Sequence, residues 1–257
     1  MAVRFDVITL FPELFAPFQT IGVTRRAFDS KAVDLRLWPL RDFAEGVYRR
    51  VDDRPFGGGP GMVMLVEPLV RALQAIRADQ QAQGGERLPV VLFSPAGRPL
   101  TQSRVASLAS SPGAVLLCGR YEGVDQRFID AYVDEELSMG DYVLSGGELP
   151  ALTLIDAVAR LQPGVLHDAA SHEQDSFSDG LLDCPHFSRP EVLTLPEGSE
   201  AAVPPVLMSG HHGRIAQWRR EQQLRITAQR RPDLIEAARA RGELSQQDEH
   251  FLSDLGL

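Results

Sequence analysis

Two short segments in the middle of the chain each combine glycines, an aromatic ring and a carboxylate. The first, 118–123, reads Cys-Gly-Arg-Tyr-Glu-Gly, and the second, 138–148, holds three glycines. Glycine tolerates positive φ angles and lets the backbone come close to a ligand. Two such loops, so near each other in sequence, predict a pocket built largely from main-chain atoms and suited to a flat, polar cofactor.

A third glycine-rich segment, 54–62, lies earlier in the chain. It holds four glycines and two prolines, and its backbone N–H groups could cradle a phosphate or the edge of a base. The alternative interpretation is an irregular turn between two elements. Because the Lys-Ser/Thr pair of a P-loop is missing, we do not expect a nucleoside triphosphate there. No Gly-x-Gly-x-x-Gly follows the first predicted strand, which argues against a Rossmann dinucleotide or ordinary methyltransferase site.

Several other reactive side chains have simple structural interpretations when each is taken alone. Cys118 ends an apolar run and is expected to be buried and inert rather than nucleophilic. His211 and His212 suit a surface or helix-start position better than a shared metal or catalytic site, because adjacent residues on a helix point in different directions. Taken alone, Arg160 is expected to interact with the dipole at a helix C-terminus, and Asp175 is expected to be a solvated acid. His and Cys show no zinc spacing, so no metal site is expected.

The composition is that of an ordinary globular protein, but the charge is unevenly distributed. Hydrophobic residues make up 44% and charged residues 24% of the 257 residues, and the net charge is −9. This length suffices for one large domain or two modest ones. Arginines nevertheless cluster in 214–231 and, with one lysine, in 25–54. Such patches either bind a polyanion or are the solvated faces of helices.

The cellular location is predicted from features that the sequence lacks. No apolar stretch reaches the roughly 18 residues of a membrane span, and 1–10 is an alternating strand pattern without a basic leader. Two cysteines are too few for a disulfide framework. We therefore expect a cytoplasmic protein with no membrane association.

The first 165 residues alternate between strand and helix patterns, which predicts a parallel sheet. Ligands of such sheets bind at the carboxyl ends of the strands, and the glycine-rich loops follow predicted strands. The expected strands are Val3–Leu10, Asp34–Trp38, Pro89–Phe93 and Ala114–Leu117, and the expected helices are Glu67–Gln83, Thr101–Ala109 and Leu149–Leu161.

The pattern changes in the last third of the chain. Residues 166–188 are polar, acidic and poor in periodicity, which indicates a flexible linker or lid. Residues 189–257 contain helical patterns at 214–231, 233–241 and 245–255. These patterns predict a small helical C-terminal domain.

Taken together, the segments resemble the bacterial tRNA (guanine-N1)-methyltransferases of the SPOUT superfamily, which methylate the guanosine 3′ to the anticodon. Their order and spacing carry the resemblance, rather than any one motif. Ala96, Val124 and Met139 depart from the family pattern, and these are mild changes beside the expected cofactor. The matching segments are 51–62, 94–95, 119–123, 140–150, 175–177, 181–186, 189–191 and 204–210.

The resemblance implies an α/β fold in which a parallel-sheet domain, 1–165, is tied in a trefoil knot that forms the cofactor pocket. A flexible linker or lid, 166–188, and an all-helical tRNA-binding domain, 189–257, are expected to follow. The cofactor implied is S-adenosylmethionine, and the substrate is the anticodon stem-loop of tRNA. The family works as a homodimer, with each active site at the subunit interface.

The resemblance also implies roles for individual residues. Asp175 is expected to remove the proton from guanine N1, and Arg160 to stabilise the charge that develops on O6. Glu122 has three open roles: binding a ribose hydroxyl, a divalent ion such as Mg²⁺, or the methionyl amine. The expected cofactor contacts are Phe93, Ser94, Pro95, Gly119, Tyr121, Glu122, Gly123, Met139, Gly140, Tyr142, Leu144, Gly146 and Gly147. The expected RNA contacts are Asp52, Gly57, Gly58, Gly59, Gly61, Arg214, Arg219 and Arg220.

Two alternatives stay open beside this interpretation. One is another enzyme on the same fold that modifies a ribose hydroxyl or a different base, and the other is a non-catalytic RNA-binding protein. Asp175 argues against ribose methylation, which needs a different proton acceptor. The combination of Asp175, Arg160 and intact glycine loops argues against a non-catalytic protein.

Overall fold

A computed structural model describes residues 2–166 and 174–256. The chain divides into two compact units, Met1–Ala169 and Ala170–Leu257, and each unit is described by itself. Part of the expected linker, 167–173, lies outside the described residues.

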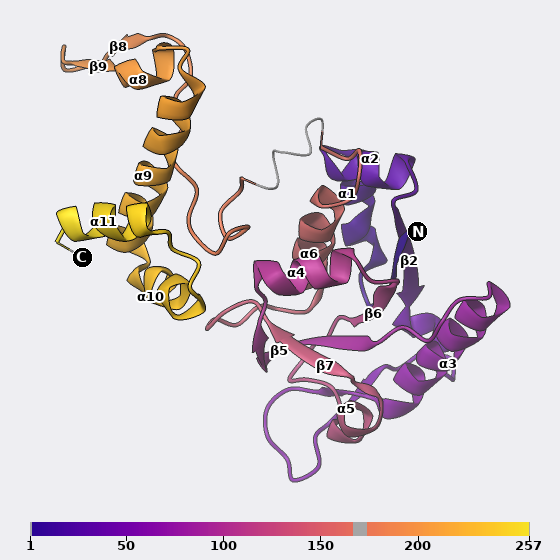
Figure 1. The fold of residues 1–257 in the computed structure, drawn as a ribbon. Coiled ribbons are helices and arrows are strands. Elements are labelled where there is room, and N and C mark those ends of the chain that lie inside the picture. The colour runs from indigo at the N-terminus through magenta and orange to yellow at the C-terminus, as the bar shows by residue number, and fades with distance from the viewer. Residues whose placement is uncertain (1, 167–173, 257) are drawn as a thin grey trace. The chain divides into compact units, whose positions relative to one another are not determined.

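The first unit is built on a five-stranded sheet in the order β2-β1-β6-β5-β7 (Figure 1). All its neighbouring strands are parallel, which confirms the prediction of a parallel sheet. The central strands are short apolar runs buried on both sides, as expected of parallel sheets covered by helices. The strands are β1 (Val3–Thr9), β2 (Val33–Pro39), β5 (Val90–Pro99), β6 (Gly113–Leu117) and β7 (Glu135–Ser138).

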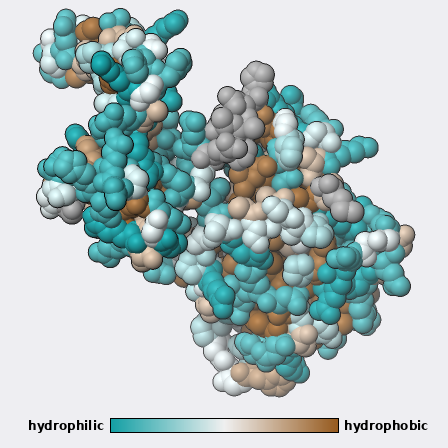
Figure 2. Space-filling model, in the orientation of Figure 1, coloured by the Kyte–Doolittle hydropathy of each residue, from teal (hydrophilic) through white to brown (hydrophobic). Residues whose placement is uncertain are grey.

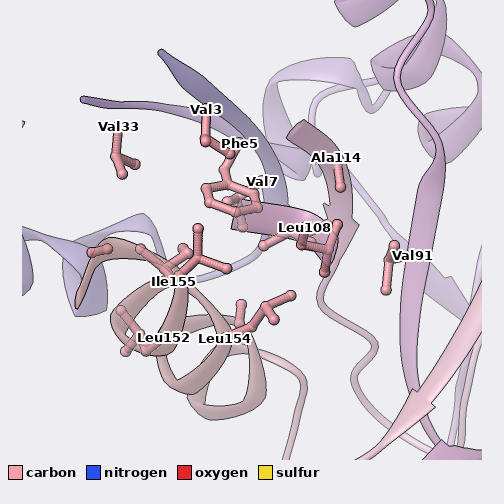
Figure 3. Close-up of a cluster of buried hydrophobic side chains, with 14 of the residues drawn as sticks. Val3, Phe5, Val7, Val33, Val91, Leu108, Ala114, Leu152, Leu154 and Ile155 are labelled. Carbon is pink, nitrogen blue, oxygen red and sulfur yellow. The ribbon is translucent and has the colours of Figure 1, made fainter. Parts of the chain in front are cut away.

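Helices cover both faces of this sheet. Successive side chains of a strand point to opposite faces, so the apolar strands bury side chains on each face. In β6, Ala114 and Leu116 join one buried cluster with α4 (Gln102–Ala109) and α6 (Glu148–Arg160). Figure 3 shows Leu154 and Ile155 of α6 on the same side of the sheet as Phe5 and Val7 of β1.

The alternate residues of β6, Val115 and Leu117, join a second cluster on the opposite face. Its helices are α3 (Val66–Ala82) and α5 (Gln126–Tyr132). The remaining elements of the first unit are short: η1 (Pro12–Phe15), α1 (Ala16–Thr20), α2 (Thr24–Asp29), η2 (Leu40–Phe43), β3 (Asp52–Asp53) and β4 (Val63–Met64).

The second unit holds four helices within its described residues. Its core is a small apolar cluster that includes Leu224, Ile235 and Leu252, and the face visible in Figure 2 is mainly hydrophilic. The helices are α8 (Pro205–Met208), α9 (His212–Arg230), α10 (Pro232–Arg241) and α11 (Gln246–Asp254).

The expectation that this part of the chain is all-helical is wrong. Strands β8 (Val192–Thr194) and β9 (Glu200–Ala202) pair as an antiparallel hairpin. Each strand has only three residues, and 195–199 closes the hairpin with Gly198 at positive φ, a conformation that glycine tolerates. Such short strands carry too little periodicity to be recognised from sequence.

The helices of the second unit begin and end at specific capping residues. The Nδ1 atom of His211 accepts the backbone N–H of Arg214 at 3.3 Å, which confirms the expected helix-start position of the histidine pair. At α11, Ser245 and Asp248 form a reciprocal capping box. Gly242 ends α10 in the left-handed conformation.

Candidate active site

The carboxyl ends of β5, β6 and β7 lie side by side and open into one cavity. At β5 the pairing with β7 breaks between Phe93 and Arg98. The segment 94–97 therefore bulges away from its neighbour, and it carries Ser94 and Pro95 to the cavity wall.

The loop after β6 is held in shape by main-chain bonds to the β3–β4 hairpin. The N–H of Glu122 donates to the carbonyl of Met62 at 2.9 Å, and the N–H of Met64 donates to the carbonyl of Gly123 at 2.9 Å. Tyr121 takes a left-handed φ of 61° within this loop. These main-chain bonds therefore fix the path of the loop.

The loop after β7 returns across the end of β5 to reach β6. Gly140 has a φ of 131°, which favours glycine. The N–H of Gly147 donates to the carbonyl of Gly119 at 2.9 Å. A Cβ on Gly147 would lie 2.6 Å from the Cα of Cys118, so only glycine permits this approach.

All thirteen residues expected to contact the cofactor line this single cavity of about 440 Å³. Ala96, Val124 and Met139, which depart from the family pattern, line it too. The cavity lies at the carboxyl edge of a parallel sheet, the usual place for a ligand in such folds. Its size falls within the roughly 300–1,000 Å³ of small-molecule sites.

A buried ion pair under this cavity was not predicted from sequence. Glu148, fully buried at the start of α6, accepts bonds from the hydroxyl of Thr9 at 2.8 Å and from Arg120 Nε at 2.8 Å. Arg120 also donates to the carbonyl of Ser145 at 3.1 Å and lies over the ring of Phe11. This network joins the end of β1 to both glycine loops. The only sequence signal was the position of Arg120 and Glu148 within those loops.

The glycine-rich loop 54–62 connects β3 to β4 beside the cavity. Gly57, Gly58, Gly59 and Gly61 all have positive φ. A Cβ on Gly61 would collide with the side chain of Glu122, which places the expected RNA loop against an expected cofactor residue.

Asp52 meets the same cavity loop through the hydroxyl of Tyr121. Burial raises the pKa of Tyr121, the charge of Asp52 and its hydrogen bond raise that pKa further, and Arg41 lowers it. The structure therefore brings Asp52 and Gly61 together with the cofactor loop.

The two expected catalytic residues belong to different units. Arg160 is the last residue of α6, at the helix C-terminus where a cation is favourable. Asp175 is half-buried in the second unit, ahead of its first strand. Both side chains have interaction partners.

The expected RNA-binding arginines of α9 have different environments. Arg214 and Arg219 are exposed. Arg220 instead bonds Asp248 at 3.0 Å and Asp179 at 2.9 Å. Its guanidinium is thus paired with carboxylates of its own unit, and its expected phosphate contact stays a prediction.

Cys118 is buried, as expected, and burial raises its pKa well above the usual value, with a further contribution from Glu148. This environment makes the thiol inert.

In the described ranges no group of three or more His, Cys, Asp or Glu is placed to hold a metal ion. No helix among the described residues is long and apolar enough to cross a membrane.

Comparison with known proteins gives the family. The family profile described as tRNA (guanine-1)-methyltransferase TrmD matches residues 3–237. A tRNA (guanine-N(1)-)-methyltransferase of Methylibium petroleiphilum is 72% identical over 254 residues, covering 98% of both chains. Proteins of the same name from Leptothrix cholodnii (71% identical, 99% of this chain and 100% of the relative) and Paracidovorax citrulli (63%, 98% of each) are also similar. The chain belongs to the tRNA (guanine-1)-methyltransferase family.

Proposed function

We propose that this protein transfers a methyl group from S-adenosylmethionine to N1 of the guanosine 3′ to the anticodon of tRNA. The family match over 3–237 and the names of full-length relatives support the reaction. The observation that carries the assignment to a site is the convergence of three loops on one cavity at the carboxyl ends of β5, β6 and β7.

The cavity fits S-adenosylmethionine in size and chemistry. Buried Leu92, Phe93 and Leu137 supply apolar walls, and the glycine loops supply main-chain donors and acceptors. Such a mixture suits an adenine ring with a ribose and an amino acid. When bound, this cofactor supplies an electrophilic methyl group. We assign Glu122 to one of three roles: binding a ribose hydroxyl, the methionyl amine or a Mg²⁺ ion.

The protein's own chemical task is to remove the proton on guanine N1, because N1 is a weak nucleophile while it is protonated. We assign that task to Asp175. A positioned general base contributes roughly 10²–10⁴-fold in rate. Arg160 stabilises negative charge that develops on O6. The acidic segment around Asp175 is assigned as a lid that orders over the substrate.

The RNA is assigned to surfaces beside the cavity and on α9. Asp52 and the glycines of 57–61 contact the target guanine and its neighbour. The target guanine must leave its stack to react. Arg214 and Arg219 contact phosphates of the anticodon stem, so that binding weakens with salt.

The proposal includes a trefoil knot and a homodimer with shared active sites. A threaded path is supported by the loop after β7, which crosses β5 and attaches to β6 through Gly147 and to β1 through Glu148. The proposed domains are a catalytic domain, 1–165, a linker or lid, 166–188, and a tRNA-binding domain, 189–257. A tRNA substrate places the enzyme in the cytoplasm.

The test is to incubate the purified chain with labelled S-adenosylmethionine and unmodified tRNA, and to locate the label by mass mapping. Label is expected on N1 of the guanosine 3′ to the anticodon. Label on a sugar oxygen would identify a ribose methyltransferase instead. No label, together with no cofactor binding in calorimetry, would indicate a non-catalytic protein.

The base is tested by Asp175→Ala in a single-turnover assay. Turnover should fall at least about 10²-fold, while cofactor affinity stays within a few-fold, because Asp175 is assigned to the guanine and not to the cofactor. Unchanged turnover would refute this assignment of the base.

A further inference from the structure

The second unit contains a cavity of its own, distinct from the cofactor site. It measures about 420 Å³ and lies between α8, the first half of α9 and the segment that leads into β8. Figure 1 shows α8 and the β8–β9 hairpin at one end of α9, and α10 and α11 at its other end. Of the residues that line it, only Arg219 has a role in the reaction proposed above.

The apolar side chains of α9 are fully buried only in its second half. The buried residues of α9 are Leu224, Thr227 and Ala228, all in its second half. In the first half, Ile215 and Trp218 are half-buried, and both line the cavity. Their spacing of three places them on one face of the helix, so this face is apolar yet lacks the cover that α10 and α11 give farther along.

An aromatic pair forms part of the cavity wall. The rings of Phe187 and Trp218 have centroids 6.1 Å apart and planes inclined at 58°. A contact between two rings inclined in this way covers at most one face of each ring, and Phe187 is 47% exposed. A flat ligand can therefore stack on an aromatic face without displacing the pair.

The cavity has a basic rim around this apolar wall. Arg189 and Arg219 line it, against one acid, Glu191, and His186 in its wall is bonded to Asp183 at 2.8 Å. Arg214, one turn before Trp218 on α9, adds another exposed cation. An aromatic surface beside arginines is the arrangement by which proteins hold an unstacked base and its phosphate.

We propose that this cavity binds one unpaired nucleotide of the RNA substrate, with its base stacked on the Phe187–Trp218 pair and its phosphate at Arg189 and Arg219. The proposal rests on the proposed function, since it adds a second RNA subsite to a tRNA methyltransferase. The cavity holds a base other than the methylated guanine, because none of the residues assigned to that guanine lines it.

The occupant is RNA rather than a peptide for reasons of charge and surface. The rim is mainly cationic, and the exposed arginines of α9 extend it toward a polyanion. An apolar peptide would bury the same rings but would leave the cations of the rim unpaired.

The experiment compares Trp218→Leu, which removes the aromatic face, with Trp218→Phe, which keeps one. Stacking on an aromatic side chain contributes about fivefold to hundredfold in affinity per base. Trp218→Leu should therefore raise the Kd for unmodified tRNA at least about fivefold, and Trp218→Phe should stay within about twofold. Cofactor affinity should not change in either variant, and equal helix content by circular dichroism shows that both are folded.

A direct readout comes from the small number of tryptophans. The chain has two, so in a Trp38→Phe background only Trp218 emits. Unmodified tRNA should quench that emission, with saturation at the concentration that saturates methylation. Arg241→Gln, a charge loss on α10 outside the cavity, serves as the control and should leave the quenching unchanged.

The outcomes separate this inference from the reaction itself. If the wild-type chain methylates tRNA but Trp218→Leu leaves the tRNA Kd unchanged, the nucleotide subsite is refuted and the reaction stands. If Trp218→Leu alters sedimentation of the protein and not its RNA affinity, the cavity is a protein interface and the inference fails. If the wild-type chain transfers no methyl group, the proposed function fails first.

Discussion

Glu148 is a carboxylate with no exposed surface, and both glycine loops are attached to it. Its partners lie far apart in sequence, with Thr9 139 positions before it and Arg120 28 positions before it. A buried carboxylate needs such partners, because its desolvation is otherwise costly. Arg120 and Glu148 therefore hold the two glycine loops together.

Replacing Arg120 by Met should strongly destabilise the first unit. The change leaves the charge of Glu148 buried and unpaired, which costs about 3–5 kcal/mol of unfolding free energy. Denaturant unfolding can be followed through Trp38 in a Trp218→Phe background. The matched control is Arg127→Met, whose pair with Asp125 is exposed at the arginine and contributes at most about 1 kcal/mol. Equal losses in the two variants would contradict a structural role for the buried pair.

At the residue scale, sequence predicted the cavity lining but not the network beneath it. The thirteen residues expected to contact the cofactor are implied by the family resemblance, and they all line one cavity. The bond between Thr9 and Glu148 depends on which strands become neighbours. No local pattern contains that information, so the pairing could not be predicted.

At the element scale, α11 depends on one half-hidden ion pair. Asp248 is 7% exposed and serves both as a capping-box residue and as the partner of Arg220. Burial alone would raise the pKa of Asp248, but hydrogen bonds from Arg220 and Ser245 and the charge of Arg220 outweigh it, so that this pKa is lowered. A carboxyl whose pKa is lowered by folding stabilises the protein above its unfolded pKa.

The stability that Asp248 contributes should therefore be present at neutral pH and be lost as the pH falls below about 4. Asp248→Asn should cost about 1–3 kcal/mol at neutral pH and show less loss on acidification than the wild type. Urea unfolding at the two pH values, followed through Trp218 in a Trp38→Phe background, measures both effects. Glu236→Gln, an exposed position on α10, is the control. If wild type and Asp248→Asn lose the same unfolding free energy on acidification, the carboxyl of Asp248 is not the source of that loss.

Sequence patterns predicted the long elements and missed the short ones. Strand β7 was missed because two of its four residues are glutamates. An edge strand can carry such charges, since it pairs with only one neighbouring strand. Strand β5 extends to Pro99, beyond the predicted end at Phe93, because it resumes pairing after a bulge. A bulge depends on the neighbouring strand and has no period of its own.

At the scale of the whole molecule, the two proposed catalytic side chains lie on different units. Arg160 belongs to the first unit, and Asp175 belongs to the second. If each active site takes one residue from each of two chains, then two inactive variants can complement each other.

Mixing Arg160→Ala chains with Asp175→Ala chains should therefore restore part of the activity. A heterodimer then holds one site with both residues and one site with neither. The mixture is refolded together so that subunits exchange, and single-turnover methylation of tRNA is compared with each variant alone. If exchange is demonstrated by mass-tagged chains and no activity returns, the shared site is excluded.

The strand order of the sheet is a property of the whole molecule that the sequence did not predict, and the trefoil knot stays a prediction from the family resemblance. The alternation of 1–165 predicted a parallel sheet, but not that β6 would lie between β1 and β5. Connection rules favour unthreaded chains, so a knot would not be predicted from elements alone.

The close approach of Gly147 to Cys118 has a consequence for any compound designed against this cavity. A side chain at Gly147 would strike the main chain of β6's loop, and one at Gly97 would lie 2.5 Å from the carbonyl carbon of Glu136. Substitutions that alter these walls therefore damage the fold itself. A competitor that bonds to backbone N–H and C=O groups would leave a microorganism few routes to resistance, since those atoms are the same whichever residue is encoded.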